Sequence, residues 1–201
     1  EAMTTATSAD AVRAHSGRRD PTIVMKHGAG GRAMRRLIQE TLTRGFVDVE
    51  VDGFGIAAMD DGAALRVGDR WLVVTTDSHV VPPVFFPGGD IGRLAIAGTV
   101  NDLAMMGATE PLGLTCGLIV EEGFTFADLE RVQQSMFDTC REAGTTVVTG
   151  DTKVMGRGEL DGMVINTTGV AMADAIVRDS GLQVGDRIRF GATGDHACEL
   201  D

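Results

Sequence analysis

The succession of apolar runs from Val47 onward limits the possible folds most, because strand-like runs are more frequent there than helical ones. Alternating or continuous apolar residues predict strands in the runs VDVEV, AALRV and WLVVTTD. Gly68 and Asp69 separate the last two runs, which is typical of a tight hairpin. The first part of this region is therefore predicted to consist of antiparallel strands.

Two helices interrupt the strands. The apolar pattern predicts a helix over about residues 90–106, followed by a strand over 112–120. Thr125, with Asp128 three residues later, resembles a capping box and marks the start of a second helix that ends at Gly144. Strands follow in TTVVTGD and MVINTTGVAM. The order β-β-β-α-β-α-β-β predicts an α+β fold with a mixed, largely antiparallel sheet and helices on one face.

Composition divides the chain into four parts. Residues 1–21 lack apolar periodicity and are expected to form a flexible arm. Residues 22–45 hold a glycine-rich segment and a helix over about 32–44, and residues 46–173 form the main domain. Residues 174–201 are predicted to be a linker and the start of a second α/β domain, with a strand in GDRIRF. Too few residues remain to complete that domain, so we expect it to be truncated.

The net charge of −11 argues against nucleic acid or an anionic membrane as a partner, because the field of the protein would repel both. A hydrophobic content of 43%, without an apolar run near the ~20 residues of a membrane helix, indicates a soluble globular protein. Cys116, Cys140 and Cys198 are odd in number and widely spaced, which fits neither a disulfide framework nor a zinc site. A reducing, cytoplasmic location is expected.

Carboxylates recur where predicted strands end or turn. Asp60 and Asp61 precede one strand, and Asp102 lies within a predicted helix. Asp77 and Asp151 each follow a run of valine and threonine, and they would lie side by side if their strands were neighbours. Converging carboxylates repel one another unless a cation lies between them, and Mg²⁺ prefers such oxygen ligands together with phosphates. The alternative is that each acid is a turn or cap residue.

Asp102 fits that alternative least well. A mid-helix aspartate beside Asn101 has poor helix propensity, and its neighbours are apolar. A buried carboxylate needs partners, and a metal is a good one. His79 and His196 are candidates for acid–base catalysis, although a hydrogen-bonded structural or turn histidine is the alternative for each.

The glycine-rich run His27-Gly28-Ala29-Gly30-Gly31 lies directly before a predicted helix. Backbone N–H groups at a helix start bind phosphates well, but glycine turns before helices are also common. Lys26 and Lys153 are the only lysines, and each lies where phosphate charge can be balanced or where a surface lysine is solvated. The sequence contains no GxxxxGK[ST] pattern, so a P-loop is excluded.

Six motifs together resemble the HypE family of hydrogenase maturation proteins. They are HGAGG at 27–31, DDGAA at 60–64, TDSHVV at 76–81, FPGGDIG at 86–92, VNDLAMMGA at 100–108 and GDTKV at 150–154. The family belongs to a superfamily of ATP-using enzymes that includes aminoimidazole ribonucleotide synthetase. The resemblance extends over about residues 22–196, and the order of the six motifs is more specific than any one of them.

The resemblance implies a homodimer whose sheets pair into a barrel-like core, with ATP and Mg²⁺ bound near the interface. It also implies the ATP-dependent dehydration of a carbamoylated C-terminal cysteine to a thiocyanate. The carbamoyl group would come from the carbamoyltransferase HypF, and the cyanide would go to iron on the HypC–HypD complex for nickel–iron hydrogenase. Because phosphate is a better leaving group than an amide oxygen, metal-bound ATP in line with that oxygen supplies most of the catalysis.

Residue roles are carried over only where the motifs match. The resemblance assigns metal–phosphate binding to five aspartates: Asp60, Asp61, Asp77, Asp102 and Asp151. It assigns nucleotide binding to the glycine-rich cover and to three further positions: His27, Gly28, Gly30, Gly31, Thr76, Asn101 and Gly150. Lys153 and Asp102 are the candidate catalytic residues.

The end of the chain departs from the family pattern. Family members continue through a complete second domain to a terminal Pro-Arg-Ile-Cys-like tail, whereas this sequence ends in Cys198-Glu199-Leu200-Asp201. We therefore expect these residues to be a fragment without the acceptor cysteine, and Cys198 not to replace it. Two other interpretations remain open: another ATP-dependent phosphoryl-transfer enzyme of the same superfamily, and a non-catalytic dimerisation or interaction module.

Overall fold

The computed structural model describes residues 22–187, and the chain divides into two units, residues 1–45 and 46–201, which are described separately here. Four predictions fall wholly or partly outside the described residues: the arm at 1–21, the second half of the GDRIRF strand at 188–190, and any role of His196 or Cys198. The first half of that predicted strand, residues 185–187, is described and is not a strand. In the part of the chain that is described, no helix is both long and apolar enough to cross a lipid bilayer.

The first unit contains the predicted helix that follows the glycine-rich run. A 3₁₀ turn, η1 (Met25–His27), precedes the α-helix α2 (Gly31–Leu37), and a π-helical turn, η2 (Ile38–Leu42), continues it. Gly30 and Gly31 have positive φ angles of 77° and 72°, which explains the need for glycine before this helix.

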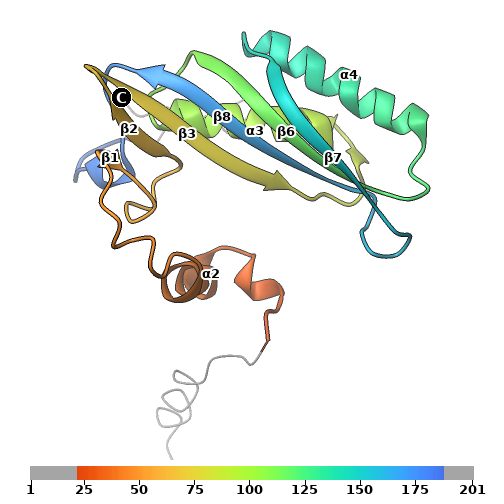
Figure 1. The fold of residues 1–201 in the computed structure, drawn as a ribbon, viewed down its shortest axis with the longest axis horizontal. Coiled ribbons are helices and arrows are strands. Elements are labelled where there is room, and N and C mark those ends of the chain that lie inside the picture. Colours follow the sequence, from red (N-terminus) through yellow and green to blue (C-terminus); the bar gives the residue numbers. More distant parts are fainter. Residues whose placement is uncertain (1–21, 188–201) are drawn as a thin grey trace, which may run out of the picture. The chain divides into compact units, whose positions relative to one another are not determined.

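The second unit is built on a six-stranded sheet (Figure 1). In spatial order the strands are β1 (Gly53–Phe54), β2 (Ala63–Val67), β3 (Arg70–His79), β8 (Met163–Ala173), β6 (Pro111–Glu121) and β7 (Val147–Met155). Neighbouring strands are antiparallel except β6 and β7, which are parallel. The prediction of a mixed, largely antiparallel sheet is therefore confirmed.

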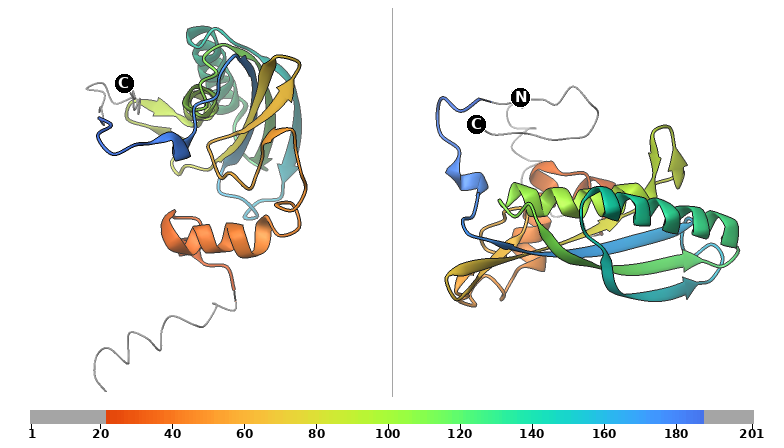
Figure 2. Two further views of the ribbon diagram at one scale, coloured as in Figure 1. Left: turned by 90° about the vertical axis from the view of Figure 1, so that its left-hand side faces the viewer. Right: turned by 90° about the horizontal axis from the view of Figure 1, so that it is seen from above.

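Both long helices, α3 (Ile91–Met105) and α4 (Phe126–Glu142), lie along the same face of the sheet (Figure 2). Side chains from both helices share one buried cluster with side chains of β6 and β8. Along β8, buried and half-buried residues alternate without exception. One face of the sheet is thus covered by helices, and we call the opposite face the open face, because no helix of residues 46–187 covers it.

Smaller elements connect these layers. A two-stranded hairpin of β4 (Phe85–Phe86) and β5 (Gly89–Asp90) leads into α3, and the 3₁₀ turn η3 (Asp179–Gly181) follows β8. At the junction with α3, the Asp90 side chain accepts hydrogen bonds from two backbone N–H groups of the first helical turn. This N-cap defines the start of the helix that carries Asn101 and Asp102.

The predicted N-cap at Thr125, at the start of α4, is present, without the reciprocal backbone bond of a full capping box among the described hydrogen bonds. The Thr125 hydroxyl accepts a hydrogen bond from the backbone N–H of Asp128 at 3.0 Å. It also donates to the Asp128 carboxylate at 2.8 Å. The helix ends at Glu142, and Gly144 follows with a φ of 67°, as its predicted position at the helix end requires.

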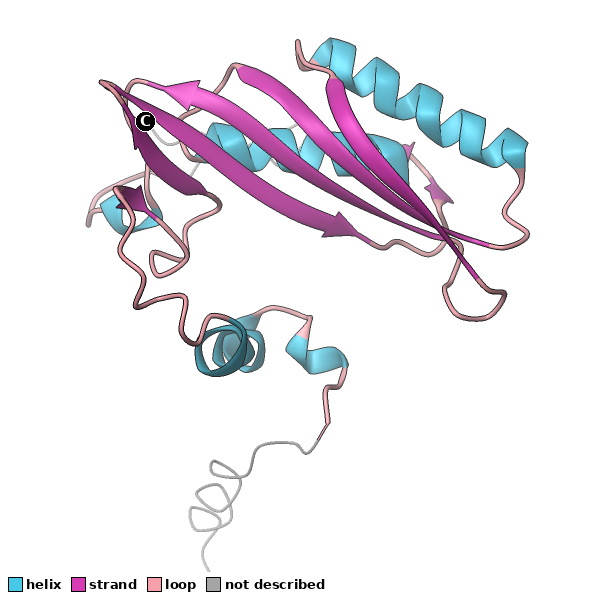
Figure 3. Cartoon of the chain, in the orientation of Figure 1, coloured by secondary structure: helices cyan, strands magenta, loops and turns pink. Residues whose placement is uncertain are grey.

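The VDVEV run does not form the predicted strand, and Figure 3 shows this stretch as loop. Val47, Val49 and Val51 are 43%, 62% and 41% exposed. An alternating pattern indicates a strand only if a neighbouring strand is available for its backbone hydrogen bonds, and the first pairing in this unit begins at Gly53. The strand prediction for residues 47–51 is therefore wrong.

The hairpin at Gly68 and Asp69 is confirmed, since the flanking residues of β2 and β3 pair directly. Both strands that carry predicted site residues are longer than predicted. Strand β3 continues past Asp77 to His79, and β7 continues past Asp151 to Met155. The two aspartates thus lie inside strands and not at strand ends.

Close contact between α3 and α4 depends on Gly92. A Cβ atom added at this position would lie 2.5 Å from the carbonyl oxygen of Val132 on α4. We expect Gly92→Ala to lower the free energy of unfolding by about 2 kcal/mol, because overpacking outweighs the better helix propensity of alanine. Urea denaturation measures this change. Gly117→Ala is the matched control, since its added Cβ would meet only Asn166 atoms at 3.9 Å; equal stability of the two variants would contradict the prediction.

Candidate functional site

Thr75 on β3 joins two of the predicted acidic segments. Its hydroxyl lies 2.8 Å from the backbone carbonyl oxygen of Asp61 and 3.1 Å from Oδ2 of Asp102. Thr75 is 5% exposed and faces the helices, so it links the loop before β2 to the last turn of α3. The 60–61 loop and Asp102, both assigned to metal–phosphate binding by the resemblance, are therefore brought together by one side chain of β3.

Asp102 lies in an unfavourable electrostatic environment. The pKa of its carboxyl is raised to about 6, mainly by burial and also by the nearby charges of Asp61 and Asp77, whereas the hydrogen bond from Thr75 opposes the shift. The pKa of Asp61 is also raised, first by burial and then by Asp179 and Asp60. The charges of two predicted metal ligands, Asp61 and Asp77, thus lie close enough to destabilise the charged form of a third, Asp102.

Asp77 is held by its neighbours on β3. Oδ2 lies 3.2 Å from Nε2 of His79, and Oδ1 accepts a hydrogen bond from the backbone N–H of Ser78 at 2.7 Å. His79 is only 7% exposed, and α3 approaches it so closely that a Cβ on Gly98 would lie 2.8 Å from Nε2. The structure therefore gives His79 a definite contact with a candidate ligand, while its acid–base role stays a prediction.

The side chain of Asp60 has a different environment from that of Asp61. Its carboxylate is 2% exposed and pairs with Nε of Arg178 at 2.7 Å. Asp61, in contrast, is an exposed residue. The two consecutive acids of the DDGAA motif therefore have different environments, one neutralised in the interior and one at the surface.

Asp151 and Lys153 lie apart from this group. Across the sheet, Asp77 pairs with Thr167, Thr167 with Cys116, and Cys116 with Gly150. Two strands separate β3 from β7, which corresponds to roughly 14 Å for three strand spacings. The strands are not neighbours, so the hypothesis that Asp77 and Asp151 lie side by side is wrong for a single chain.

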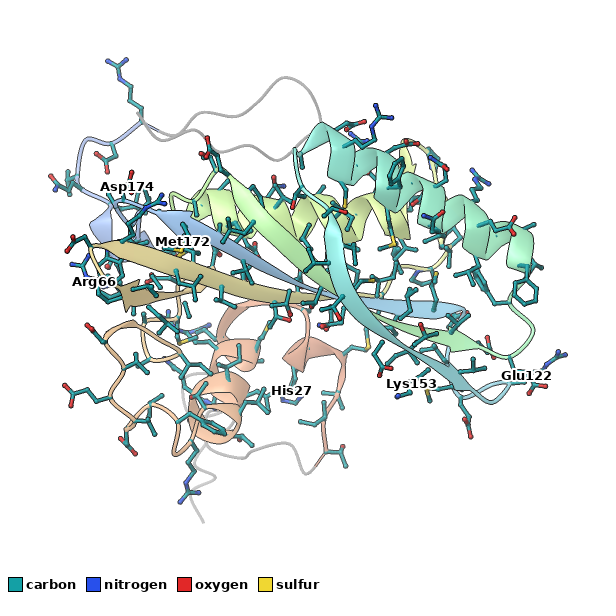
Figure 4. All side chains as sticks on the ribbon, turned by 45° about the horizontal axis from the view of Figure 1, so that its top comes forward. His27, Arg66, Glu122, Lys153, Met172 and Asp174 are labelled. Carbon is teal, nitrogen blue, oxygen red and sulfur yellow. The ribbon has the colours of Figure 1, made fainter. Side chains whose placement is uncertain are left out.

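The side chains of Asp151 and Lys153 also belong to the open face of the sheet. They form an ion pair at 2.9 Å, with side chains 70% and 67% exposed, and Lys153 comes from the edge strand β7 (Figure 4). Lys153 lowers the pKa of Asp151 by its hydrogen bond, with help from the backbone N–H of Thr152. Gly150 faces the helices instead and borders a cavity of about 390 Å³ beneath α4, which Asp151 and Thr152 also line.

The remaining predicted nucleotide contacts occupy three places. Thr76 lies on the open face, where its hydroxyl donates to the carbonyl of Thr167 at 3.2 Å and accepts from Thr168 at 3.0 Å. Asn101 is exposed on α3 beside Asp102. The glycine-rich cover belongs to the first unit of the chain, and its members are His27, Gly28, Gly30 and Gly31.

The carboxylates of this site fit Mg²⁺ as a pair of ligands that water and phosphate oxygens would complete. Within residues 22–187, no group of three or more His, Cys, Asp or Glu residues is arranged closely enough to enclose a metal ion. Mg²⁺, however, is usually held by one or two carboxylates together with water and substrate phosphates. Asp61 and Asp102 supply such carboxylates, and their raised pKa values show that a cation would stabilise the site.

Sequence reasoning missed two residues of this site. Thr75 was treated only as part of a strand, although a hydroxyl two positions before Asp77 faces the same side of β3. Arg178 was placed in a linker, and nothing in its local sequence indicates its partner Asp60, which is 118 positions away.

Comparison with known proteins defines the class to which this fold and site belong. The chain matches the family described as "AIR synthase related protein, N-terminal domain" over residues 59–173, which is more than half of its length. The chain therefore belongs to the AIR synthase related family.

Within this class the similarity is to HypE proteins. Carbamoyl dehydratase HypE of Azotobacter vinelandii is 48% identical over 185 residues, covering 90% of this chain and 52% of the relative. The crystal structure of a HypE-HypF complex matches with a TM-score of 0.66 and 44% identity, over 76% of this chain and 48% of that one. HypE in complex with ATP matches with a TM-score of 0.50 and 45% identity, over 85% and 48%. The predicted resemblance to the HypE family is confirmed, and the chain spans about half the length of the curated relatives it matches.

The raised pKa of Asp102 predicts a specific pH dependence. The carboxyl has a pKa of about 6 in the folded chain against 3.8 in the unfolded chain, so the folded state binds the proton more tightly. The resulting stabilisation is fully present below pH ~4 and is lost as the pH rises through about 6. Relative to the parent chain, Asp102→Asn should therefore gain on the order of 1–2 kcal/mol between pH 4.5 and 7.5, less than the full shift because the group is only partly buried.

Urea denaturation without added Mg²⁺ at several pH values measures this difference. Asn retains an oxygen that can accept the Thr75 hydrogen bond, so the variant tests charge and not the loss of that contact. Asp69→Asn, in the exposed hairpin between β2 and β3, is the control and should show no pH-dependent gain. A stability difference for Asp102→Asn that is the same at all pH values would show that its pKa is not raised.

Proposed function

We propose that this chain is the ATP-binding half of a carbamoyl dehydratase that converts a protein S-carboxamide to a thiocyanate in hydrogenase maturation. The observation that carries the proposal is the convergence of Asp61, Asp77 and Asp102 around β3, where each additional negative charge raises the pKa of Asp102. The solved HypE structure in complex with ATP, at 45% identity, supports a nucleotide as the ligand of these acids.

The residues of this site have distinct roles in the proposal. Magnesium bound at Asp61 and Asp102 would neutralise the phosphate charge of ATP. Thr75 holds the two acidic segments together, and His79 holds the carboxylate of Asp77 in place. Asn101, exposed beside Asp102, can donate its amide N–H to a phosphate oxygen, which would help to orient it.

The acceptor chemistry is proposed for the whole protein. Transfer of the γ-phosphoryl group from ATP to the carboxamide oxygen releases ADP. Loss of that oxygen as phosphate, together with the two N–H protons, leaves the thiocyanate, so the two steps remove the elements of one water from the carboxamide. The HypE-HypF complex structure supports HypF as the carbamoyl donor partner. Three further parts of the proposal rest on the resemblance to the HypE family. The HypC–HypD complex would accept the cyanide, residues 27–31 would cover the nucleotide, and the protein would act in the cytoplasm.

Nucleotide binding is testable on the chain as it stands. Addition of MgATP should raise its melting temperature, because a ligand that binds only the folded state stabilises it by mass action. Asp61→Asn and Asp102→Asn should each lose most of this Mg²⁺-dependent increase while melting cooperatively without ligand. Differential scanning calorimetry with ATP, Mg²⁺ and both together measures the effect, and Asp69→Asn should behave like the parent chain.

A parent chain that shows no shift with MgATP would contradict the proposed nucleotide site. That result would instead favour the non-catalytic interaction module. A parent chain that responds to MgATP, with Asp61→Asn and Asp102→Asn responding equally well, would place the nucleotide away from these acids.

We further propose that the open face of the sheet is the surface on which two copies pair. Within residues 46–187, the helices α3 and α4 cover only the other face, and the residues of β8 that face away from them are all half-buried. Among these residues, Val164, Val170 and Met172 are apolar side chains on a central strand. A second copy of the same sheet would cover them, as the barrel-like dimer implied by the resemblance requires.

Val170→Arg should convert such a dimer to a monomer, because a charged side chain at the centre of the interface would be desolvated without a partner. Sedimentation velocity measures the change in oligomeric state, and circular dichroism verifies that the sheet is retained. Ala127→Arg, at an exposed position of α4, introduces the same side chain on the opposite side and should leave the dimer intact. A parent chain that sediments as a monomer at all concentrations would refute the pairing.

A further inference from the structure

The segment that follows β8 is bonded to two acid-bearing parts of the site. The guanidinium of Arg178 pairs with the buried carboxylate of Asp60 at 2.7 Å. The backbone N–H of Val177 donates to the carbonyl oxygen of Met106 at 3.1 Å, immediately after α3. Met106 is itself bonded through its N–H to the carbonyl of Asp102, at 3.2 Å. Two consecutive residues thus connect the 60–61 loop with the end of the helix that carries Asp102.

Aromatic side chains fix the position of Arg178. Its guanidinium lies 4.2 Å from the centre of the Phe54 ring, and Phe54 stacks on Trp71 with ring centres 5.4 Å apart. Arg66 lies over the Trp71 ring at 4.1 Å. These contacts restrict Arg178 to one arrangement, in which 28% of its side chain is exposed and it neutralises a carboxylate that is nearly inaccessible to solvent.

From these contacts we propose that Arg178 is a positioning residue for the nucleotide site, and that Asp60 is its anchor and not a ligand of metal or phosphate. This inference rests on the proposed nucleotide-binding function. The Arg178–Asp60 pair holds the backbone of the DDGAA motif, so that Asp61 presents its carboxylate while its carbonyl oxygen contacts Thr75. Removal of the arginine leaves a buried carboxylate without its cation, and the 60–61 loop must move to hydrate it.

Four variants of the full chain test this inference. Arg178→Gln removes the charge of the cation alone, Asp60→Asn removes that of the anion, and the double variant Asp60→Asn/Arg178→Gln replaces the ion pair by a neutral amide pair. Arg70→Gln is the matched control, because Arg70 also binds the segment after β8, through Asp174 at 2.6 Å, but both partners are exposed. Figure 4 shows Asp174 and Arg66 at the end of the sheet remote from Lys153, so none of these changes affects the Asp151–Lys153 pair.

Isothermal titration with MgATP and the fluorescence of Trp71, the only tryptophan, provide two independent measurements. Arg178→Gln should weaken MgATP binding by about 10-fold or more, as does the loss of residues that orient metal ligands elsewhere. The double variant should recover affinity to within about 3-fold of the parent, since it leaves no unpaired charge. Trp71 emission should shift in Arg178→Gln even without nucleotide, because the ring that Arg178 contacts stacks on the indole.

The outcomes separate this inference from the proposed function. If the parent chain binds MgATP and the double variant is as defective as Asp61→Asn, then Asp60 is a ligand and the inference is wrong. An Arg178→Gln variant that binds like Arg70→Gln overturns it as well. If Arg178→Gln does not fold, Arg178→Lys retains the charge without the planar guanidinium and should give intermediate affinity; affinity equal to the parent's would refute the positioning role. A parent chain that does not bind MgATP refutes the proposed function itself.

Discussion

The contact between the Thr75 hydroxyl and the carboxylate of Asp102 is the interaction on which the candidate site depends. It fastens α3 to β3, in a layer where a second polar contact, between Thr99 and Thr167, joins α3 to β8. The same hydroxyl contacts the carbonyl of Asp61, so one side chain fixes the relative position of a strand, a helix and a loop. The raised pKa of Asp102 reflects its burial and the negative charges of Asp61 and Asp77 nearby, and a bound cation would stabilise the charged form of this carboxylate.

The five acids assigned to metal–phosphate binding differ in how their charge is already balanced. Asp60 has Arg178 and Asp151 has Lys153 as an ion-pair partner, and Asp77 has contacts to His79 and to a backbone N–H. Asp61 and Asp102 have their pKa values raised and are not paired with a cationic side chain among the described ion pairs. The unbalanced charge is therefore concentrated on two carboxylates, which is the number that Mg²⁺ commonly uses beside phosphate oxygens.

Features set by local sequence could be predicted, and features set by distant pairing could not. The N-cap at Thr125, the hairpin at Gly68 and the extent of α3 depend on neighbouring residues, and all were predicted correctly. The position of β7 depends on which strands lie between it and β3, which neither strand encodes locally. For the same reason the burial of Asp60 could not be predicted, because its cation comes from a segment beyond the last strand. The VDVEV run shows the opposite error, because its alternating pattern predicts a strand but no neighbouring strand pairs with it.

The location of Lys153 limits how the two candidate catalytic residues can act. Asp102 belongs to the face of the sheet that α3 covers, whereas Lys153 lies on the open face, two strands away from β3. A side chain cannot reach through a paired sheet, so the two residues of one chain cannot act on the same phosphate. If the open faces of two copies pair, the Lys153 ammonium would be desolvated in their interface, where the charge of Asp151 already balances it. In this geometry the charge of a nucleotide at the proposed site would be balanced by the residues beneath α3, and the catalytic role of Lys153 stays a prediction.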